Sequence, residues 1–225
     1  MNDKPIAHSF SSTSAYETCG YQYQQVNLLK NFQGEEHPAA KFGTERHKDV
    51  EVALETDTDI EGEYAYYNEY LDRIRQWDGF KIPEMQLAID RAWQPCDWFS
   101  KAAWYRAIVD ITVINAEQAN VVDLKTGKHR LKPRQANDSA LLLFFHFPEL
   151  QDIHFEFWWT EAGAPPDVFD FNRTRDADTM IKTMTAIPEQ IELSAETKDW
   201  PTNPSGLCRG YCPVVSCKHW KPRRE

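Results

Sequence analysis

The chain has 225 residues, of which 41% are hydrophobic and 13% aromatic, and its net charge is −10 at pH 7. This supply of large apolar side chains excludes a disordered chain and predicts a globular protein with one main domain, residues 1–225. No apolar run is long enough to span a bilayer, and the N-terminus lacks the features of a signal peptide, so we expect a cytoplasmic protein without a membrane partner. Five cysteines without an export signal argue against a disulfide framework.

The acidic net charge alone argues against a nucleic-acid partner, but the charges are unevenly distributed. Residues 45–78 hold 11 acids against four Lys or Arg, whereas residues 125–134 hold five Lys or Arg and no acid. The last eight residues add four basic residues against one acid. A protein with an acidic body and local basic patches can still follow a phosphate backbone. Solvated surface is the simpler interpretation of such runs when they are taken alone.

The N-terminal part, residues 1–80, is predicted to be helical. Apolar residues recur at helical spacing, and Ser or Thr stands at the start of the first segment. Gly20 lies inside that first segment and weakens it. The predicted helices cover residues 11–32, 39–55 and 63–77, with an acidic loop at residues 55–63.

The middle of the chain, residues 81–160, changes to strand patterns rich in β-branched and aromatic residues. The predicted strands cover residues 84–93, 104–114, 120–125 and 152–160, with a helix from about Gln135 between the last two. Residues 161–200 are predicted to be mainly helical, with Pro188 forcing a kink or a break. Residues 201–225 form a Pro- and Gly-containing tail with three cysteines. This order predicts an α/β fold with a mixed central β-sheet flanked by helices.

Two acids and a lysine are expected to meet on one face of a hairpin. The strands of residues 104–114 and 120–125 are joined by a short polar connector, so antiparallel pairing is the simplest arrangement. Symmetric pairing places Asp110 opposite Lys125. Because residues two apart on a strand share a face, Asp110, Asp123 and Lys125 would then point the same way. A slip of one residue would place them on opposite faces.

Such a cluster suits phosphodiester hydrolysis. Carboxylate oxygens favour Mg²⁺ or Mn²⁺, which lowers the pKa of a bound water, and a nearby ammonium can orient that water. Asp110 also interrupts an otherwise apolar strand, where a lone carboxylate is costly unless it is paired or bound to metal. A structural ion pair between Asp110 and Lys125 would satisfy the same electrostatics, so both interpretations stay open.

The ordered motifs resemble the PD-(D/E)XK nuclease superfamily, and in particular its RecB-type branch, which includes CRISPR-associated and phage exonucleases. "IVD" is followed thirteen residues after its acid by "DLK", with "KTGK" behind it. "GTERH" resembles the Gly-x-x-x-His helix of that branch, although a histidine on this helix face is more often a core residue. "PEMQLAI" resembles the strand that often supplies a further acid, and "QANDS" resembles its Gln-x-x-x-Tyr motif with serine in place of tyrosine.

The resemblance implies a restriction-endonuclease-like core and a set of roles. It implies metal ligands at His47, Glu84, Asp110 and Asp123. It implies catalytic roles for Asp110, Asp123, Lys125 and Gln135, in which Lys125 positions the attacking water. The basic run beside them is expected to bind DNA through Lys128, Arg130, Lys132 and Arg134.

Three cysteines cluster in the tail with the spacing C-x3-C-x4-C, and a fourth is near the N-terminus. Clustered thiols suggest ligands for a soft metal or a cluster. Some RecB-type exonucleases bind a 4Fe–4S cluster in this way and pin the tail onto the N-terminal helix, although their usual tail spacing is C-x2-C-x5-C. The expected ligands of the cluster, or of zinc as the alternative, are Cys19, Cys208, Cys212 and Cys217. His219 could replace Cys19 at a zinc site, reduced cysteines without metal stay open, and Cys96 is expected to take no part.

The sequence therefore predicts a Mg²⁺- or Mn²⁺-dependent deoxyribonuclease, with exonuclease activity in DNA processing, recombination or repair as the leading hypothesis. A protein partner in those processes is compatible with the chain. A second hypothesis is an inactive nuclease-fold module that binds DNA or a protein partner through its basic patches. A third is a cysteine-rich metal-binding interaction protein whose central acids form only structural ion pairs.

Overall fold

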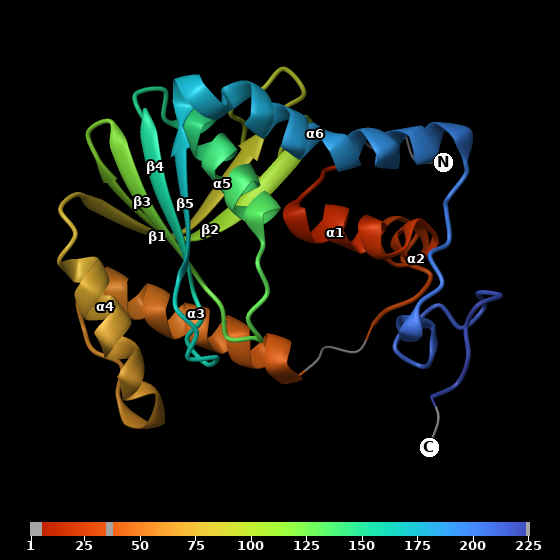
Figure 1. Ribbon diagram of the computed structural model, residues 1–225, viewed down its shortest axis with the longest axis horizontal. Coiled ribbons are helices and arrows are strands. Elements are labelled where there is room, and N and C mark those ends of the chain that lie inside the picture. The colour runs from red at the N-terminus through yellow and green to blue at the C-terminus, as the bar shows by residue number, and fades with distance from the viewer. Residues whose placement is uncertain (1–5, 35–37, 224–225) are drawn as a thin grey trace. The chain divides into compact units, whose positions relative to one another are not determined.

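A five-stranded mixed sheet lies at the centre of the first of two compact units (Figure 1). The structure is a computed structural model that describes residues 6–34 and 38–223. The first unit contains residues 6–7 and 38–183, and the second contains residues 8–34 and 184–223. The predicted α/β class with a mixed sheet and flanking helices is confirmed.

The strands follow one another across the sheet in chain order. Only β3 and β4 pair in parallel, while the other neighbours are antiparallel. A parallel pair needs a crossover, which helix α5 (Pro133–His146) supplies. The strands are β1 (Phe80–Ile89), β2 (Tyr105–Asn115), β3 (Gln118–Leu124), β4 (Asp152–Trp158) and β5 (Asp167–Asn172).

Three sequence predictions need correction. Strand β1 begins four residues before the predicted start at residue 84. The region predicted to be helical contains strand β5, which is only six residues long and is fixed by its pairing with β4. Helix α6 (Arg173–Thr197) continues through Pro188 without a break. A proline lacks only one intrahelical donor, and tertiary packing of a long helix can offset that loss.

Helices α3 (Pro38–Thr56) and α4 (Asn68–Arg75) cover one face of the sheet. A 3-10 segment, Gly62–Tyr67, leads into α4. Helix α3, the 3-10 segment and α4 each contribute buried apolar residues to the core on this face. Strands β2, β3 and β4 contribute the rest. These buried residues are Val50, Ala53, Tyr67, Leu71, Ile74, Ile111, Val113, Val122, Leu124 and Trp158.

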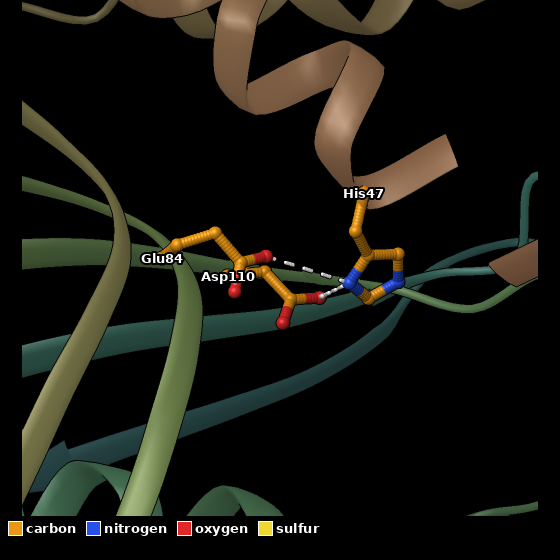
Figure 2. A group of neighbouring side chains, drawn as sticks. All are labelled: His47, Glu84 and Asp110. Carbon is orange, nitrogen blue, oxygen red and sulfur yellow. Dashed lines mark ion pairs between the residues drawn. The ribbon is translucent and has the colours of Figure 1, made fainter. Parts of the chain in front are cut away.

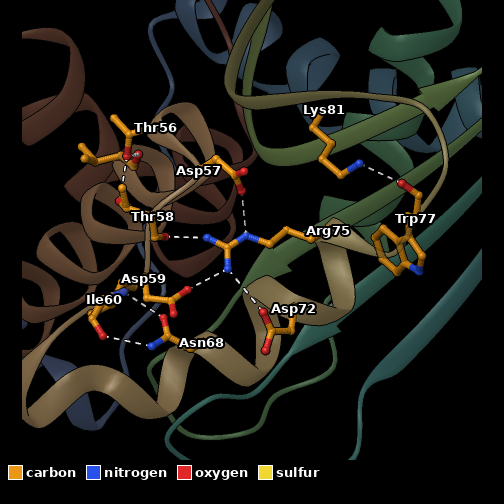
Figure 3. A network of polar contacts seen from close by, with 11 residues as sticks. Thr56, Asp57, Thr58, Asp59, Ile60, Asn68, Asp72, Arg75, Trp77 and Lys81 are labelled. Carbon is orange, nitrogen blue, oxygen red and sulfur yellow. Dashed lines mark hydrogen bonds and ion pairs between the residues drawn. The ribbon is translucent and has the colours of Figure 1, made fainter.

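The acidic loop between α3 and the 3-10 segment is fastened by Arg75 (Figure 3). Its guanidinium pairs with Asp59 at 2.8 Å and with Asp57 and Asp72 at 3.3 Å, and it donates a hydrogen bond to the carbonyl of Thr58 at 2.5 Å. Four acceptors around one cation explain how a loop so rich in acids keeps one conformation.

The second unit brings the N-terminal helices and the tail together. Helix α1 (Phe10–Thr18) ends at Cys19, whose extended backbone separates it from α2 (Gly20–Tyr23) and from the π-helix Gln24–Leu28 that follows. The predicted helix over residues 11–32 is therefore interrupted. A side chain at Gly20 would stand 2.9 Å from the Pro201 ring, so glycine is needed where the tail crosses. Elsewhere in the tail, Gly206–Cys208 forms a short 3-10 helix.

None of the helices in the described part of the chain combines the length and the apolarity that crossing a membrane requires.

Candidate metal and nuclease site

Three acids stand in one row across three strands of the sheet. The β1–β2 ladder pairs Pro83 with Ile111 and Met85 with Val109, so Glu84 faces Asp110. Strand β3 continues the row, because its ladder with β2 ends at Ile111 and Val122, which places Asp123 next, opposite Asp110. Glu84 also has a φ of 46°, a left-handed conformation that is rare for residues with a side chain. Such strain is found most often at functional sites.

His47 reaches this row from helix α3, as Figure 2 shows. Its Nδ1 lies 3.3 Å from Asp110 Oδ2 and 3.7 Å from Glu84 Oε1. Its Nε2 lies 2.9 Å from the carbonyl oxygen of Leu124, to which it donates a hydrogen bond. This bond fixes the ring so that Nδ1 faces the carboxylates. One ligand atom from each of His47, Glu84 and Asp110 lies within 4.8 Å of the others, a spacing that fits a single cation.

Asp123, Lys125 and Gln135 form the adjoining half of the site. Lys125 Nζ makes an ion pair with Asp123 Oδ1, and Gln135 Nε2 donates a 2.6 Å hydrogen bond to Asp123 Oδ2. Asp123 is only 4% exposed. Asp123 Oδ1 has the Lys125 ammonium as its charged partner, whereas the buried Gln135 Oε1 has no hydrogen-bond partner among the described residues. An unpaired buried acceptor of this kind is costly, so this half of the site can take a further donor.

The charged groups shift one another's pKa values. Burial is the largest influence on Asp123 and, with the negative charge of Asp110, raises its pKa to about 6. Burial also acts to raise the pKa of Asp110, but the hydrogen bond and charge of His47 hold it below its usual range. Burial would lower the pKa of His47, yet its bonds to Asp110 and Glu84 raise it to about 10. The neighbouring carboxylates therefore favour a proton on His47 Nδ1, and a cation bound through Nδ1 would replace that proton.

The predicted hairpin register was wrong by two residues. The expected pairing placed Asp110 opposite Lys125, whereas the observed ladder places it opposite Asp123. The connector is a turn of only two residues, since Asn115 pairs with Gln118. Because the slip is even, both acids stay on the same face, and Lys125 follows two residues after Asp123, just beyond the end of β3.

The basic run, residues 128–134, leaves the site between β3 and α5. Lys128 and Arg130 are exposed, and Lys132 is partly buried. Burial lowers the pKa of Lys132, and the positive charges of Lys125 and Arg130 lower it further, whereas Asp123 acts in the opposite direction. Lys132 therefore lies close enough to Asp123 and Lys125 for their charges to act on it. The four predicted DNA-binding cations thus belong to a segment that begins at the site.

Sequence reasoning missed the contact that holds this basic run in place. His129 Nε2 lies 3.1 Å from both carboxylate oxygens of Asp167, at the start of β5. Trp159 Nε1 donates a 3.0 Å hydrogen bond to the same carboxylate, and its ring packs edge-on against His129. The two residues are 38 positions apart, and β5 itself was not predicted, so no local signal could reveal the pair.

The sequence also did not identify the backbone N–H and carbonyl of Leu124 as part of the site. Its N–H donates a 2.9 Å hydrogen bond to Asp110 Oδ2, and its carbonyl accepts the bond from His47. Every residue carries these groups, so the sequence holds no signal for them. Gly43 has a geometric role one helical turn before His47, because a side chain there would stand 3.0 Å from Thr126 Oγ1. Helix α3 can therefore lie close to the segment that follows Lys125.

The four predicted cysteine ligands line one pocket of the second unit. Burial, followed by smaller effects that include the other three thiols, raises the pKa of Cys212. Among the described residues, however, no three cysteine sulfur atoms lie within 4.8 Å of one another. A closed tetrahedral zinc site with Zn–S bonds of about 2.3 Å needs sulfur separations of roughly 3.8 Å. The described thiols thus share a pocket without forming a compact group of metal ligands, and this spacing supports neither the zinc site nor the iron–sulfur cluster.

Comparisons with known proteins give a likeness of fold alone. No family model and no curated protein matches the chain. A candidate exonuclease from Eubacterium rectale is 13% identical with a TM-score of 0.49, and the match covers 96% of this chain and 87% of that one. A protein designated SSO0001 is 12% identical with a TM-score of 0.46, covering 97% and 87% respectively. These matches carry no argument about function, which must come from the site itself.

Proposed function

We propose that the protein is a Mg²⁺- or Mn²⁺-dependent DNA nuclease of the PD-(D/E)XK superfamily, most similar to its RecB-type branch, and that it acts as an exonuclease. One observation carries the proposal. A histidine and two acids within reach of one cation share a row with Asp123, a buried acid whose carboxylate pairs with Lys125. A structural ion pair between one acid and Lys125 would not need a row of three acids, because each further buried carboxylate is costly.

The residues present fit a hard divalent cation. His47 Nδ1 and carboxylate oxygens of Glu84, Asp110 and Asp123 would hold it, and oxygen-rich donor sets of this kind favour Mg²⁺ or Mn²⁺. His47 donates its other ring N–H to the Leu124 carbonyl, as metal-binding histidines commonly do with an oxygen acceptor. When bound, such a cation supplies a Lewis acid that lowers the pKa of a coordinated water.

The remaining residues supply positioning and charge. Lys125 is held by its backbone, because its N–H donates to the Trp158 carbonyl at 2.8 Å and its carbonyl accepts from Thr160 N at 3.1 Å. Its ammonium would orient the attacking water and stabilise negative charge on the phosphate. Gln135 keeps Asp123 in place through the 2.6 Å hydrogen bond. The cations of residues 128–134 would meet the DNA backbone next to the reacting phosphate.

We also propose a 4Fe–4S cluster bound by Cys19, Cys208, Cys212 and Cys217. The support for this proposal is that all four thiols line one pocket, since cysteine thiolates are the ligands that hold such clusters. Iron and sulfide analysis of anaerobically purified protein tests this. Equal iron content in the parent and in Cys212→Ser would refute the assignment, and Cys96→Ser is the matched control.

The proposed nuclease activity is tested by the release of nucleotides from linear DNA with added Mn²⁺ or Mg²⁺, using open and end-blocked substrates. Lys125→Met should lower the rate by about 100-fold or more, since it removes a charged donor aimed at the reacting group. Lys81→Met, which changes another partly buried lysine of the same unit, should leave the rate unchanged. Equal rates for both variants would refute the site, and DNA binding without turnover would favour an inactive nuclease-fold module.

A further inference from the structure

The C-terminal tail carries a concentration of positive charge that the central site does not use. Residues 200–224 contain five Lys or Arg and no Asp or Glu, in a chain whose net charge is −10. Three of these cations and a histidine line one open pocket of the second unit, formed by Arg209, Lys218, His219 and Lys221. Arg209, Lys218 and Lys221 are all exposed, and none of them forms an ion pair with a described residue.

The backbone holds this pocket in a defined shape. Lys221 N donates a 2.8 Å hydrogen bond to the Cys208 carbonyl, and a β-bridge pairs Arg209 with Lys221. Gly210 permits this close approach, because it has a φ of 73° and a Cβ there would stand 2.8 Å from Arg223 Cβ. The cations of two separate tail segments are therefore held together by main-chain contacts, although like charges repel.

An exposed aromatic residue adjoins these charges. Tyr211 is 62% exposed, and the guanidinium of Arg223 lies 5.1 Å from the centre of its ring. Binding of a single small anion would require only the positively charged side chains and not the aromatic ring. Cations together with an exposed aromatic ring suit a polymer that offers both phosphates and bases.

We propose that this tail pocket binds backbone phosphates of DNA, at a site separate from the metal centre. The identity of DNA as the ligand rests on the proposed nuclease function, whereas the phosphate chemistry rests on the tail alone. Arg209, Lys218 and Lys221 each neutralise phosphate charge, and Tyr211 offers a face for a neighbouring base. The pocket adds affinity for the DNA strand without taking part in cleavage.

The test is fluorescence anisotropy with labelled single-stranded DNA in EDTA, so that no cleavage occurs, at several salt concentrations. The triple variant Arg209→Gln, Lys218→Gln, Lys221→Gln should make the slope of log K against log salt shallower by about 2, given about 0.7 for each phosphate contact on a single strand. If the parent and the triple variant bind equally at 1 M salt, this difference in slope makes the triple variant bind about 100-fold more weakly than the parent at 0.1 M salt. The matched control neutralises three other exposed lysines, Lys30, Lys101 and Lys198, and should keep the parent slope.

Two further measurements identify the ligand. Replacing chloride by inorganic phosphate at equal ionic strength should weaken DNA binding of the parent more than that of the triple variant. Equal slopes for the triple variant and its control would overturn the proposal. It would also be overturned if the triple variant lost binding to phosphatidylserine vesicles while its affinity for DNA stayed equal to that of the parent. Thermal unfolding of both triple variants checks that each remains folded. Because these assays need no turnover, their result is independent of whether the central site cleaves DNA.

Discussion

Replacing Asp123 by Asn should abolish cleavage and at the same time stabilise the fold. The pKa of Asp123 rises from its ordinary value of 3.8 to about 6, mainly through burial and then through the charge of Asp110. At about 1.4 kcal/mol for each pH unit, keeping this carboxylate ionised at pH 7 costs roughly 3 kcal/mol. The amide removes that cost but also removes the ion pair with Lys125. The net gain in the free energy of unfolding should be about 1–3 kcal/mol.

The stabilisation by Asp123→Asn should depend on pH in a direction that can be measured. Because the folded state binds the proton more tightly than the unfolded state, the parent loses stability as the pH rises from about 4 to about 6. The advantage of Asp123→Asn should therefore be absent below pH 4 and complete above pH 6. Urea unfolding monitored by tryptophan fluorescence at pH 4, 5, 6 and 7 measures it.

Glu156 provides a matched control, since it is also buried, with 4% of its surface exposed. Its carboxylate accepts hydrogen bonds from Arg73 Nη2 at 3.0 and 3.1 Å and from Trp158 Nε1 at 2.7 Å, and His154 Nε2 lies 3.1 Å away. The same change, Glu156→Gln, should destabilise the fold by about 1–3 kcal/mol, because it leaves those donors poorly paired. If Asp123→Asn destabilises the protein as Glu156→Gln does, Asp123 is a structural ion-pair partner and the reasoning fails.

Helix α3 and the partly exposed His154 give two more predictions. Gly43→Val should push the helix away from Thr126 and displace His47, which lowers the cleavage rate by about 10-fold or more. Gly127→Val, where a Cβ meets nothing within 4 Å, should cleave as the parent does, and equal rates for both variants would contradict the close approach. Burial acts to lower the pKa of His154, but hydrogen bonds to two carboxylates raise it above 6.5. His154→Gln should therefore cost up to about 1 kcal/mol below pH 6.5, and the cost should disappear as the pH rises through the folded-state pKa. A cost that grows with pH in urea unfolding would contradict this.

One part of the site geometry followed from strand periodicity, whereas the roles of His47, Glu84 and Gln135 were implied only by the family resemblance. Because side chains alternate between the two faces of a strand, the sequence was enough to place Asp110 and Asp123 on one face. The observed β2–β3 register differs from the predicted one by two residues, so both acids still share that face. The register itself was not predictable, because the two-residue turn contains Ala116 at a φ of 52° rather than the Asn-Gly or Asp-Gly pair that signals such turns. Nothing local in the sequence distinguishes this turn from a longer connector.

Other parts of the site depend on contacts between distant segments. The left-handed backbone of Glu84 gives no compositional signal, because residues in that conformation are usually glycine or asparagine. Strand β5 was missed because its six residues include two acids and form a strand only against β4. Its absence from the prediction also hid the Asp167 contact that holds the basic run.

The acid row includes a residue of an edge strand. Glu84 belongs to β1, which lies at the edge of the sheet and is paired on one side only. Edge segments open locally at a lower free energy than the centre of a sheet, so one ligand can separate from the other two while the rest of the fold persists. Heating should therefore inactivate the protein before it unfolds. Hydrogen exchange along β1, rather than the global melting temperature, would then report the working range of the site.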